Sequence, residues 1–311
     1  MSTRDEKTDD GVGKTPEKEL WHFTDQNGLY PILVGPDGLM AGHVAFMSDI
    51  EDSLLCRRLN ALAIQFFAYA KERSNTKDDE TAKLIRKLKN TAQCGTLFPM
   101  FATCFTAGEP DEKHWIERTG NGGFAIRFQS KLFDELQHKY PQSKIEKSVR
   151  PKSELPLDDG GVFGECSYDS YVKELNTMAQ TEEAVQQFKD FAAKRADPPK
   201  EEMSEADRIF FNMRAQAERL AFVKRPSFRW EKEYRLAYFF PDTSVPLNRL
   251  RFVGNRPFVT MELAEPLGNY VKEIRISPLG NVTKSTVIAH LVGAAIGLAP
   301  DFINTEGLRI C

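Results

Sequence analysis

In WEKEYRLAYFF, Trp230 to Phe240, polar and apolar side chains alternate as they do along a β-strand with one buried face. Successive side chains of a strand point to opposite faces, so Glu231, Glu233 and Arg235 are expected on one face. The other face is strongly aromatic and apolar, and it carries Trp230, Tyr234, Leu236, Tyr238 and Phe240 together with Lys232. The pattern predicts a strand that packs on a core through its aromatic side.

Two interpretations of Glu231 and Glu233 fit this strand. In the first, they form an ion-pair ladder with Arg235 on a solvated face, which stabilises a fold by well under about 1 kcal/mol. In the second, they form a catalytic acid pair. The alternation alone favours the first interpretation, because structural ion pairs far outnumber catalytic ones.

Segments on either side of this strand have the periods of further strands and helices. Strands are expected at LWHFTD (20–25), in FPMFATCFTAG (98–108), at GGFAIRFQ (122–129) and at VKEIRISP (271–278). Helices are expected at about 51–73 and 78–91, in EPDEKHWIERTG (109–120) and at 282–298, and a loop is expected at 241–257. Strands with helical insertions, rather than regular alternation, predict an α+β fold with a mixed, mainly antiparallel sheet.

The chain is expected to form one domain. Its 311 residues are enough for a substantial core. Residues 1–18 are polar and charged and predict a disordered tail, followed by a single α+β domain over 19–311. A mainly helical insertion is expected at about 171–222.

The composition of the chain indicates which kinds of binding partner and which compartment to expect. A formal net charge of -3 and a pI near 6.1 give no signature of nucleic-acid or anionic-lipid binding, so a small molecule or a protein is the expected partner. The five cysteines are scattered and predict neither a disulfide framework nor a zinc site. The longest apolar run, residues 287–299, is shorter than the roughly 20 residues that a membrane span needs. We therefore expect a cytoplasmic protein; its oligomeric state is left open.

Two further groups of residues are candidates for a site. His22 and Thr24 share one side of their predicted strand and could bind one ligand, although a lone histidine between aromatics is more often bonded to backbone. On the middle strand, Cys104 and Thr106 share a face. An enzyme that uses the Cys104 thiol as nucleophile, with His114 to activate it, is a weaker functional alternative. The histidines and acids have no metal-ligand spacing, so no metal is expected.

Several short motifs occur in an order that resembles the bacterial domain-of-unknown-function family 2971. They are WHFT (21–24), MSDIED (47–52), CFT (104–106), Asp111 with Trp115, GGFAIRF (122–128), FRWEKEYR (228–235) and IRISP (274–278). The resemblance covers residues 19–298. Ser48 stands where this family usually has asparagine, Thr106 where it has serine, and Ser277 where it has glycine.

The pattern of that family in turn resembles the ADP-ribosyltransferase superfamily, which implies a split sheet and NAD as substrate. Carried over, His22 would hold a ribose hydroxyl of NAD, and Thr24 would assist it. Thr106 would fall near the middle-strand binding position. Arg235 is also expected to contact the nucleotide. Nicotinamide would stack on an aromatic ring, for which Trp21, Phe23, Tyr30 and Trp115 are the candidates.

The resemblance also implies the catalytic residues and the activity. Glu233 would be the glutamate of the late strand, and Glu231 its partner in an E-x-E pair. Cleavage of the nicotinamide–ribose bond develops oxocarbenium character, which a carboxylate stabilises, and a second carboxylate can take a proton from the acceptor. The expected activity is transfer of ADP-ribose to an unknown macromolecular acceptor, in phage defence or as a toxin-like effector. The alternative is a non-catalytic module of a defence system that senses a nucleotide or a phage protein.

Overall fold

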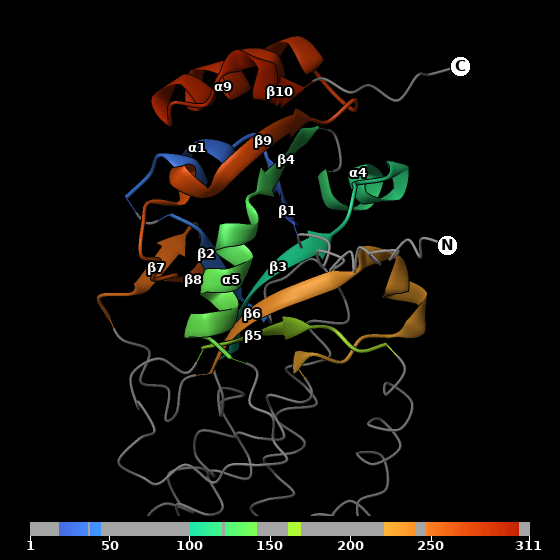
Figure 1. The fold of residues 1–311 in the computed structure, drawn as a ribbon, viewed down its shortest axis with the longest axis vertical. Helices are drawn as coiled ribbons and strands as arrows, with labels where there is room; N and C mark the ends of the chain where they lie inside the picture. The colour runs from blue at the N-terminus through green and yellow to red at the C-terminus, as the bar shows by residue number, and fades with distance from the viewer. Residues whose placement is uncertain are drawn as a thin grey trace, which may run out of the picture.

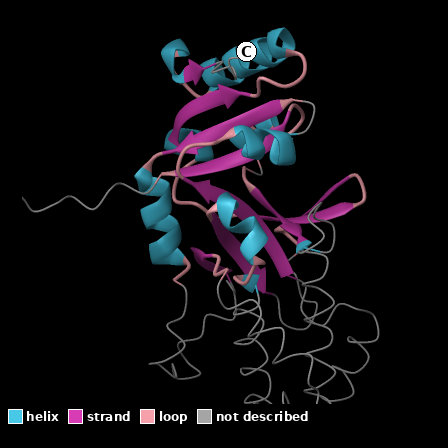
Figure 2. Cartoon of the chain, turned by 90° about the vertical axis from the view of Figure 1, so that its right-hand side faces the viewer, coloured by secondary structure: helices cyan, strands magenta, loops and turns pink. Residues whose placement is uncertain are grey.

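The computed structural model describes residues 19–36, 38–44, 100–119, 122–141, 161–168, 221–239 and 247–304. These residues form an α+β fold with helices arranged around a large twisted sheet (Figures 1 and 2). The tail expected at 1–18, the helices expected at 51–73 and 78–91 and the motif at 47–52 lie outside the described residues. The same is true of the insertion expected at 171–222, apart from residues 221 and 222.

The sheet is mixed and mainly antiparallel, as the sequence predicted. Its strands are β1 (Leu20–Asp25), β2 (Met40–His43), β3 (Met100–Ala107), β4 (Gly123–Phe128), β5 (Gly161–Glu165), β6 (Glu233–Phe239), β7 (Leu250–Val253), β8 (Arg256–Thr260), β9 (Val271–Ile276) and β10 (Ile303–Asn304). Their order is β10-β9-β4-β1-β3-β2-β8-β7, and β6 pairs with β3 and β5. Among the pairs of described strands, only β9 and β10 run parallel.

The described helices are short, apart from one at the end of the domain. They are α1 (Leu29–Leu33), α4 (Glu112–Thr119), α5 (Ser130–Lys139) and α9 (Val282–Ala295), with 3-10 turns η3 (Pro226–Glu231), η5 (Leu267–Tyr270) and η6 (Pro300–Phe302). The helix expected at 109–120 is α4, and the Asp111 carboxylate accepts a hydrogen bond from the His114 amide in its first turn. No described helix is long and apolar enough to cross a membrane.

Two expectations need correction. The segment 241–257, expected to be a loop, contains β7 and the start of β8, which form a hairpin closed at Gly254. Gly254 has φ +60°, which suits such a turn, but the strands carry few buried side chains and so lack a clear alternating pattern. The last helix ends at Ala295 instead of 298, and Gly297 follows with φ +72°.

The sheet branches at β3. Along one edge, Met100 to Thr106 pair with Phe239 to Glu233 of β6. The other edge is shared, because β1 pairs with Thr106 and Ala107 while β2 pairs with Phe101 and Ala102. Between these two pairings, the edge at residues 103–105 has no strand partner among the residues that the structure describes. The sheet is thereby divided into a β1-β4-β9-β10 part and a β3-β6-β5-β2-β8-β7 part.

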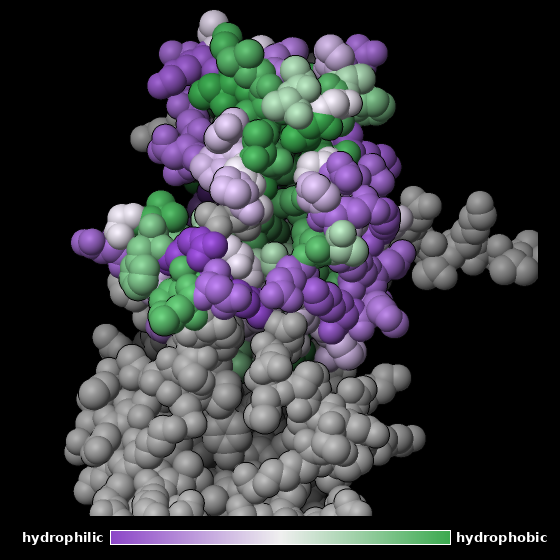
Figure 3. Space-filling model, turned by 90° about the vertical axis from the view of Figure 1, so that its left-hand side faces the viewer, coloured by the Kyte–Doolittle hydropathy of each residue, from purple (hydrophilic) through white to green (hydrophobic). Residues whose placement is uncertain are grey.

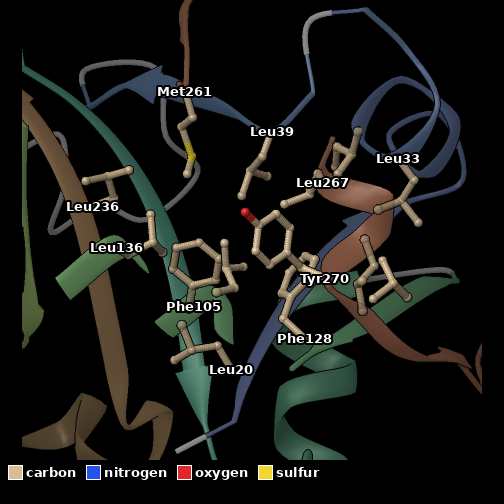
Figure 4. Packing of buried hydrophobic residues seen from close by; sticks show 14 of the residues in the cluster. Leu20, Leu33, Leu39, Phe105, Phe128, Leu136, Leu236, Met261, Leu267 and Tyr270 are labelled. Atoms are coloured by element: carbon tan, nitrogen blue, oxygen red, sulfur yellow. The ribbon is translucent and has the colours of Figure 1, made fainter. Parts of the chain in front are cut away.

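The main core lies on one face and joins the two parts of the sheet. Leu20 from β1, Phe105 from β3 and Phe128 from β4 meet Leu136 from α5 and Leu236 from β6 in this core (Figure 4). Three members of the predicted apolar row of the late strand, Tyr234, Leu236 and Tyr238, lie in this core as expected. Phe240 lies outside the described residues, and Trp230 is not part of the strand. Helices α1, α5 and α9 contribute further buried side chains, namely Leu29, Ile32, Leu33, Leu132, Phe133, Ala289 and Val292.

The opposite face of the sheet carries α4 and most of the buried charge. Trp21 and Ala125 pack there against Trp115 of α4, with Phe23 beside them. Farther along, Ala237 and Phe239 of β6 belong to a smaller apolar cluster. Apolar surface is visible at the top of the molecule (Figure 3), where Figure 1 shows α9. Val287 and Leu291 of α9 are exposed.

Candidate functional site

Five charged side chains from four segments meet on the α4 side of the sheet. Glu233 and Arg235 come from β6, Glu231 from η3, Lys224 from the segment before η3, and Arg118 from the last turn of α4. Four of them are 3% exposed or less, and only the Arg118 side chain, at 23%, reaches solvent to any extent. The solvated ladder considered from sequence is therefore wrong, because this face of β6 is buried.

Glu233 is held at the start of β6 through its backbone. Its amide donates to the Tyr168 hydroxyl at 2.9 Å, and its carbonyl accepts from the Cys166 amide at 2.9 Å. Across the sheet, Glu233 pairs with Thr106, which in turn pairs with Trp21. These three side chains therefore form one row on the α4 face.

The backbone position of Glu231 differs from the predicted one. It is the last residue of η3 and is not part of the strand, which begins at Glu233. Lys232 lies between the two glutamates in a left-handed conformation, with φ 44° and ψ 48°. A left-handed residue interrupts the two-residue alternation of side chains along a strand. The two carboxylates therefore lie close together because the backbone turns at Lys232, and not because they share a strand face.

Every carboxylate oxygen of the pair contacts a cation. Lys224 Nζ donates to Glu231 Oε2 at 2.5 Å and to Glu233 Oε2 at 2.7 Å. Arg118 Nη2 lies 2.6 Å from Glu231 Oε1 and 3.6 Å from Glu233 Oε2. Arg235 Nε donates to Glu233 Oε1, and its Nη1 donates to the Ala221 carbonyl at 3.0 Å.

The two glutamates have opposite proton affinities. Burial, and then the hydrogen bond with Glu233, raises the pKa of Glu231 to about 7, although Arg118 and Lys224 oppose this. Burial alone would also raise the pKa of Glu233, but the charges of Arg235 and Lys224 outweigh it and hold that pKa well below its usual range. Near neutral pH, Glu231 can therefore exchange a proton while Glu233 stays an anion.

His22 is fixed at the branch of the sheet. Its Nδ1 donates to the Cys104 carbonyl at 3.0 Å, on the edge of β3 that no described strand pairs with. Burial lowers the pKa of His22, so its ring is neutral and Nε2 is a hydrogen-bond acceptor. Because His22 follows Trp21, it projects from the opposite face to Glu233, with its ring 5.9 Å from that of Phe105. The structure does not bring His22 and Glu233 to one face.

The other predicted contacts divide between the two faces. Thr24 shares the His22 side of β1, as predicted, and its hydroxyl lies close to Gly28, where an added Cβ would be 1.9 Å away. Thr106 lies beside Glu233 and is buried. Arg235 is 1% exposed and bonded to Glu233 and Ala221, so its observed contacts are within the protein.

Of the aromatic residues proposed to stack nicotinamide, Trp21 and Trp115 are buried against each other in the α4 cluster. Phe23 is half-buried, and Tyr30 is exposed on α1, on the other side of the sheet. Trp230, which the sequence placed in the core row, instead lies in η3 beside Glu231 and is half-buried. Lys113 Nζ lies 4.5 Å from the centre of its ring.

The geometry gives little support to an enzyme that uses the Cys104 thiol. Cys104 is half-buried on β3, and His22 bonds its backbone carbonyl through Nδ1. The Nδ1 atom of His114 bonds Asp111 at 2.7 Å. In the part of the chain that the structure describes, no group of three or more His, Cys, Asp or Glu side chains is arranged to hold a metal ion.

Sequence reasoning missed Lys224, Arg118 and Tyr168. Arg118 could have been suspected, because a basic residue in the last turn of a helix is common, but its partners come from β6 and η3. Lys224 has no local signal. Its position follows from a backbone bridge between Ser167 and Val223, residues far apart in the sequence.

Comparison with protein-family models finds no match, and comparisons with curated proteins and with solved structures find none either. The family resemblances drawn from the motifs therefore stay predictions.

Proposed function

We propose that the protein is an ADP-ribosyltransferase-like enzyme that cleaves the nicotinamide–ribose bond of NAD. The observation that carries the proposal is the buried Glu231–Glu233 pair, in which one carboxyl titrates near neutral pH and the other stays ionised. Two further features support it. Glu233 begins the late strand β6 next to Thr106 of the middle strand β3, and the sheet branches at β3.

In the proposed reaction, the two carboxyls have separate roles. The bond from ribose C1′ to nicotinamide breaks, and its electron pair leaves with nicotinamide, which becomes neutral. The anionic Glu233 stabilises the positive charge that develops on the ribose. An acceptor nucleophile then bonds to C1′, and its proton passes to Glu231. This division makes Glu231, and not Glu233, the proton acceptor.

Access to the pair depends on Arg118. The guanidinium covers Glu231 Oε1 and approaches Glu233 Oε2, and its side chain is the most exposed of the five. For NAD to reach the carboxylates, Arg118 must turn outward. His22 can contribute a ribose contact through Nε2 only where NAD passes the edge of β3, because its side chain starts from the other face.

A second candidate is a non-catalytic module that binds a nucleotide or a protein. Two observations favour it: each oxygen of the pair is already bonded to a cation, and His22 and Glu233 project from opposite faces. In this case the five charges are a buried ion-pair network that fixes the structure around β6. Such networks are costly to break and need no catalytic role.

The deciding experiment measures nicotinamide release and protein labelling from labelled NAD in a cell extract. We compare wild type with Glu231→Gln and Glu233→Gln, and use Glu117→Gln, an exposed glutamate on α4, as the matched control. Both site variants should lose at least about 100-fold in rate, while the control keeps full activity. Equal rates in wild type and both site variants would remove the pair from the reaction.

Calorimetry with NAD separates the two candidates. The enzyme proposal expects binding with turnover in wild type and binding without turnover in Glu231→Gln. A wild-type protein that binds NAD or another nucleotide without releasing nicotinamide supports the binding module. A Cys104→Ala variant with full activity would eliminate the thiol alternative.

A further inference from the structure

The placement of Lys224 is determined by main-chain contacts with the segment after β5. Its amide donates to the Ser167 carbonyl at 3.0 Å, and the Ser167 amide donates to the Phe222 carbonyl at 2.6 Å. The same segment continues to Tyr168, whose hydroxyl accepts from the Glu233 amide. One short stretch of backbone therefore fixes both Lys224 and Glu233.

The Lys224 ammonium lies between the two carboxylates. Its Nζ is within hydrogen-bond distance of Oε2 of both Glu231 and Glu233, and it also lies 5.0 Å from the centre of the Phe228 ring. The side chain is 1% exposed. Because the site is buried, water screens the repulsion between the two carboxylates poorly, and a cation shared between them offsets that repulsion.

The other two cations act differently. Arg235 donates to Glu233 through Nε and to the Ala221 carbonyl through Nη1. Arg118 bonds Glu231 closely, is 3.6 Å from Glu233, and is partly exposed on α4. Against the effect of burial, the charge of Arg235 lowers the pKa of Glu233, and Lys224 bonds both members of the pair closely, at 2.5 and 2.7 Å. Among the described residues, the charged and titratable groups that face the pair are Arg118 and His114 from α4, Lys224, Arg235 from β6, and Tyr168 after β5.

We propose that Lys224 is the positioning residue that holds Glu231 and Glu233 together as one proton-sharing unit. The use of this unit, which is to accept the proton of the nucleophile, rests on the proposed function. The positioning role of Lys224 does not depend on it. Removing the ammonium takes away one positive charge beside both carboxylates, while Arg118 and Arg235 remain, so the pair binds its proton more tightly. Arginine at this position keeps the charge and is expected to keep most of the effect.

The test measures proton binding directly. The full-length protein is labelled with carbon-13 at the glutamate carboxyl carbons, and the two signals are assigned by their loss in Glu231→Gln and Glu233→Gln. In Lys224→Met, the midpoint at which the pair takes up its proton should move about 1 to 3 pH units upward. In Lys224→Arg it should stay near that of wild type, as in the control Lys131→Met, whose exposed lysine pairs with Glu265. An unchanged midpoint in folded Lys224→Met would overturn the proposal.

A double variant covers the case in which Lys224→Met does not fold. Lys224→Met with Glu231→Gln has no second carboxylate for the lysine to neutralise, so the main source of instability is gone. Its Glu233 midpoint should lie above that of Glu231→Gln alone, and equal midpoints would again contradict the role. These titrations need no substrate. Wild-type protein that releases no nicotinamide would therefore refute the proposed function and leave the assignment of Lys224 to be decided by the titrations.

Discussion

At the scale of single residues, the proton on Glu231 makes stability depend on pH. A carboxyl whose pKa is higher in the folded protein than in the unfolded chain binds more protons when folded. Its contribution to stability is therefore fully present below the unfolded pKa and declines as pH rises through about 7. Glutamine mimics the protonated form at every pH. The free energy of unfolding of wild type relative to Glu231→Gln should fall by up to about 3 kcal/mol between about pH 5 and pH 8.

Denaturant unfolding of both proteins at a series of pH values checks this. Glu117→Gln is the control, because it makes the same change of glutamate to glutamine at an exposed position on α4. Glu233 does not contribute to this pH dependence, because Arg235 and Lys224 hold its pKa well below the measured pH range despite its burial. A pH-independent difference for Glu231→Gln would mean that Glu231 is ionised throughout.

Alternation along the chain predicted the surroundings of some site residues and not of others. The faces of Phe105, Thr106 and Tyr234 follow from the two-residue period of a strand, and the structure has them as expected. The ion partners of Glu231 do not follow from any period. They come from α4 and from a bridge to residue 167, so they depend on tertiary packing that a single sequence does not encode locally.

At the scale of elements, Lys232 decides where η3 ends and β6 begins. It is the only non-glycine residue with positive φ in the described part of the chain. No sequence signal indicated this conformation, since asparagine and glycine are the usual residues there, and the strand was therefore predicted to continue back to Trp230.

Substitutions at Lys232 test this turn. Lys232→Gly should change the free energy of unfolding by less than about 1 kcal/mol, because relief of strain opposes the added freedom of the unfolded chain. Lys232→Val should destabilise by about 1 to 2 kcal/mol, since a β-branched side chain fits a left-handed residue poorly. The variants are compared by thermal and denaturant unfolding. A valine variant as stable as the glycine variant would show that the left-handed turn is not required.

At the scale of the whole molecule, the branched sheet explains how the fold and the site depend on each other. The sequence predicted an α+β fold and five of the ten described strands, β1, β3, β4, β6 and β9, because these strands have strong apolar patterning. It could not predict that β1 and β2 share one edge of β3, since strand order depends on contacts between distant segments. The two parts of the sheet share a backbone contact only where Leu20 and Trp21 pair with Ala107 and Thr106, among the pairs in the described strands. Side chains of the core must supply the rest of the connection.

Phe105 is the residue through which this connection can be tested. The centre of its ring lies 6.3 Å from that of Phe128 on β4 (Figure 4). It lies 6.2 Å from that of Phe163 on β5, so Phe105 packs against both parts of the sheet. Phe105→Ala should cost about 3 to 5 kcal/mol, as the loss of a fully buried ring does. Phe252→Ala, whose ring is exposed on β7, should cost less than about 0.5 kcal/mol.

Hydrogen exchange shows whether the two parts open together. In Phe105→Ala, amides of β4 and amides of β6 should both exchange faster than in wild type, because each strand has lost the same shared core contact. Faster exchange confined to β5 and β6 would mean that the two parts are stabilised separately. In that case the branch at β3 would be a boundary between independent units, and Glu233 could lose its surroundings while His22 keeps its own.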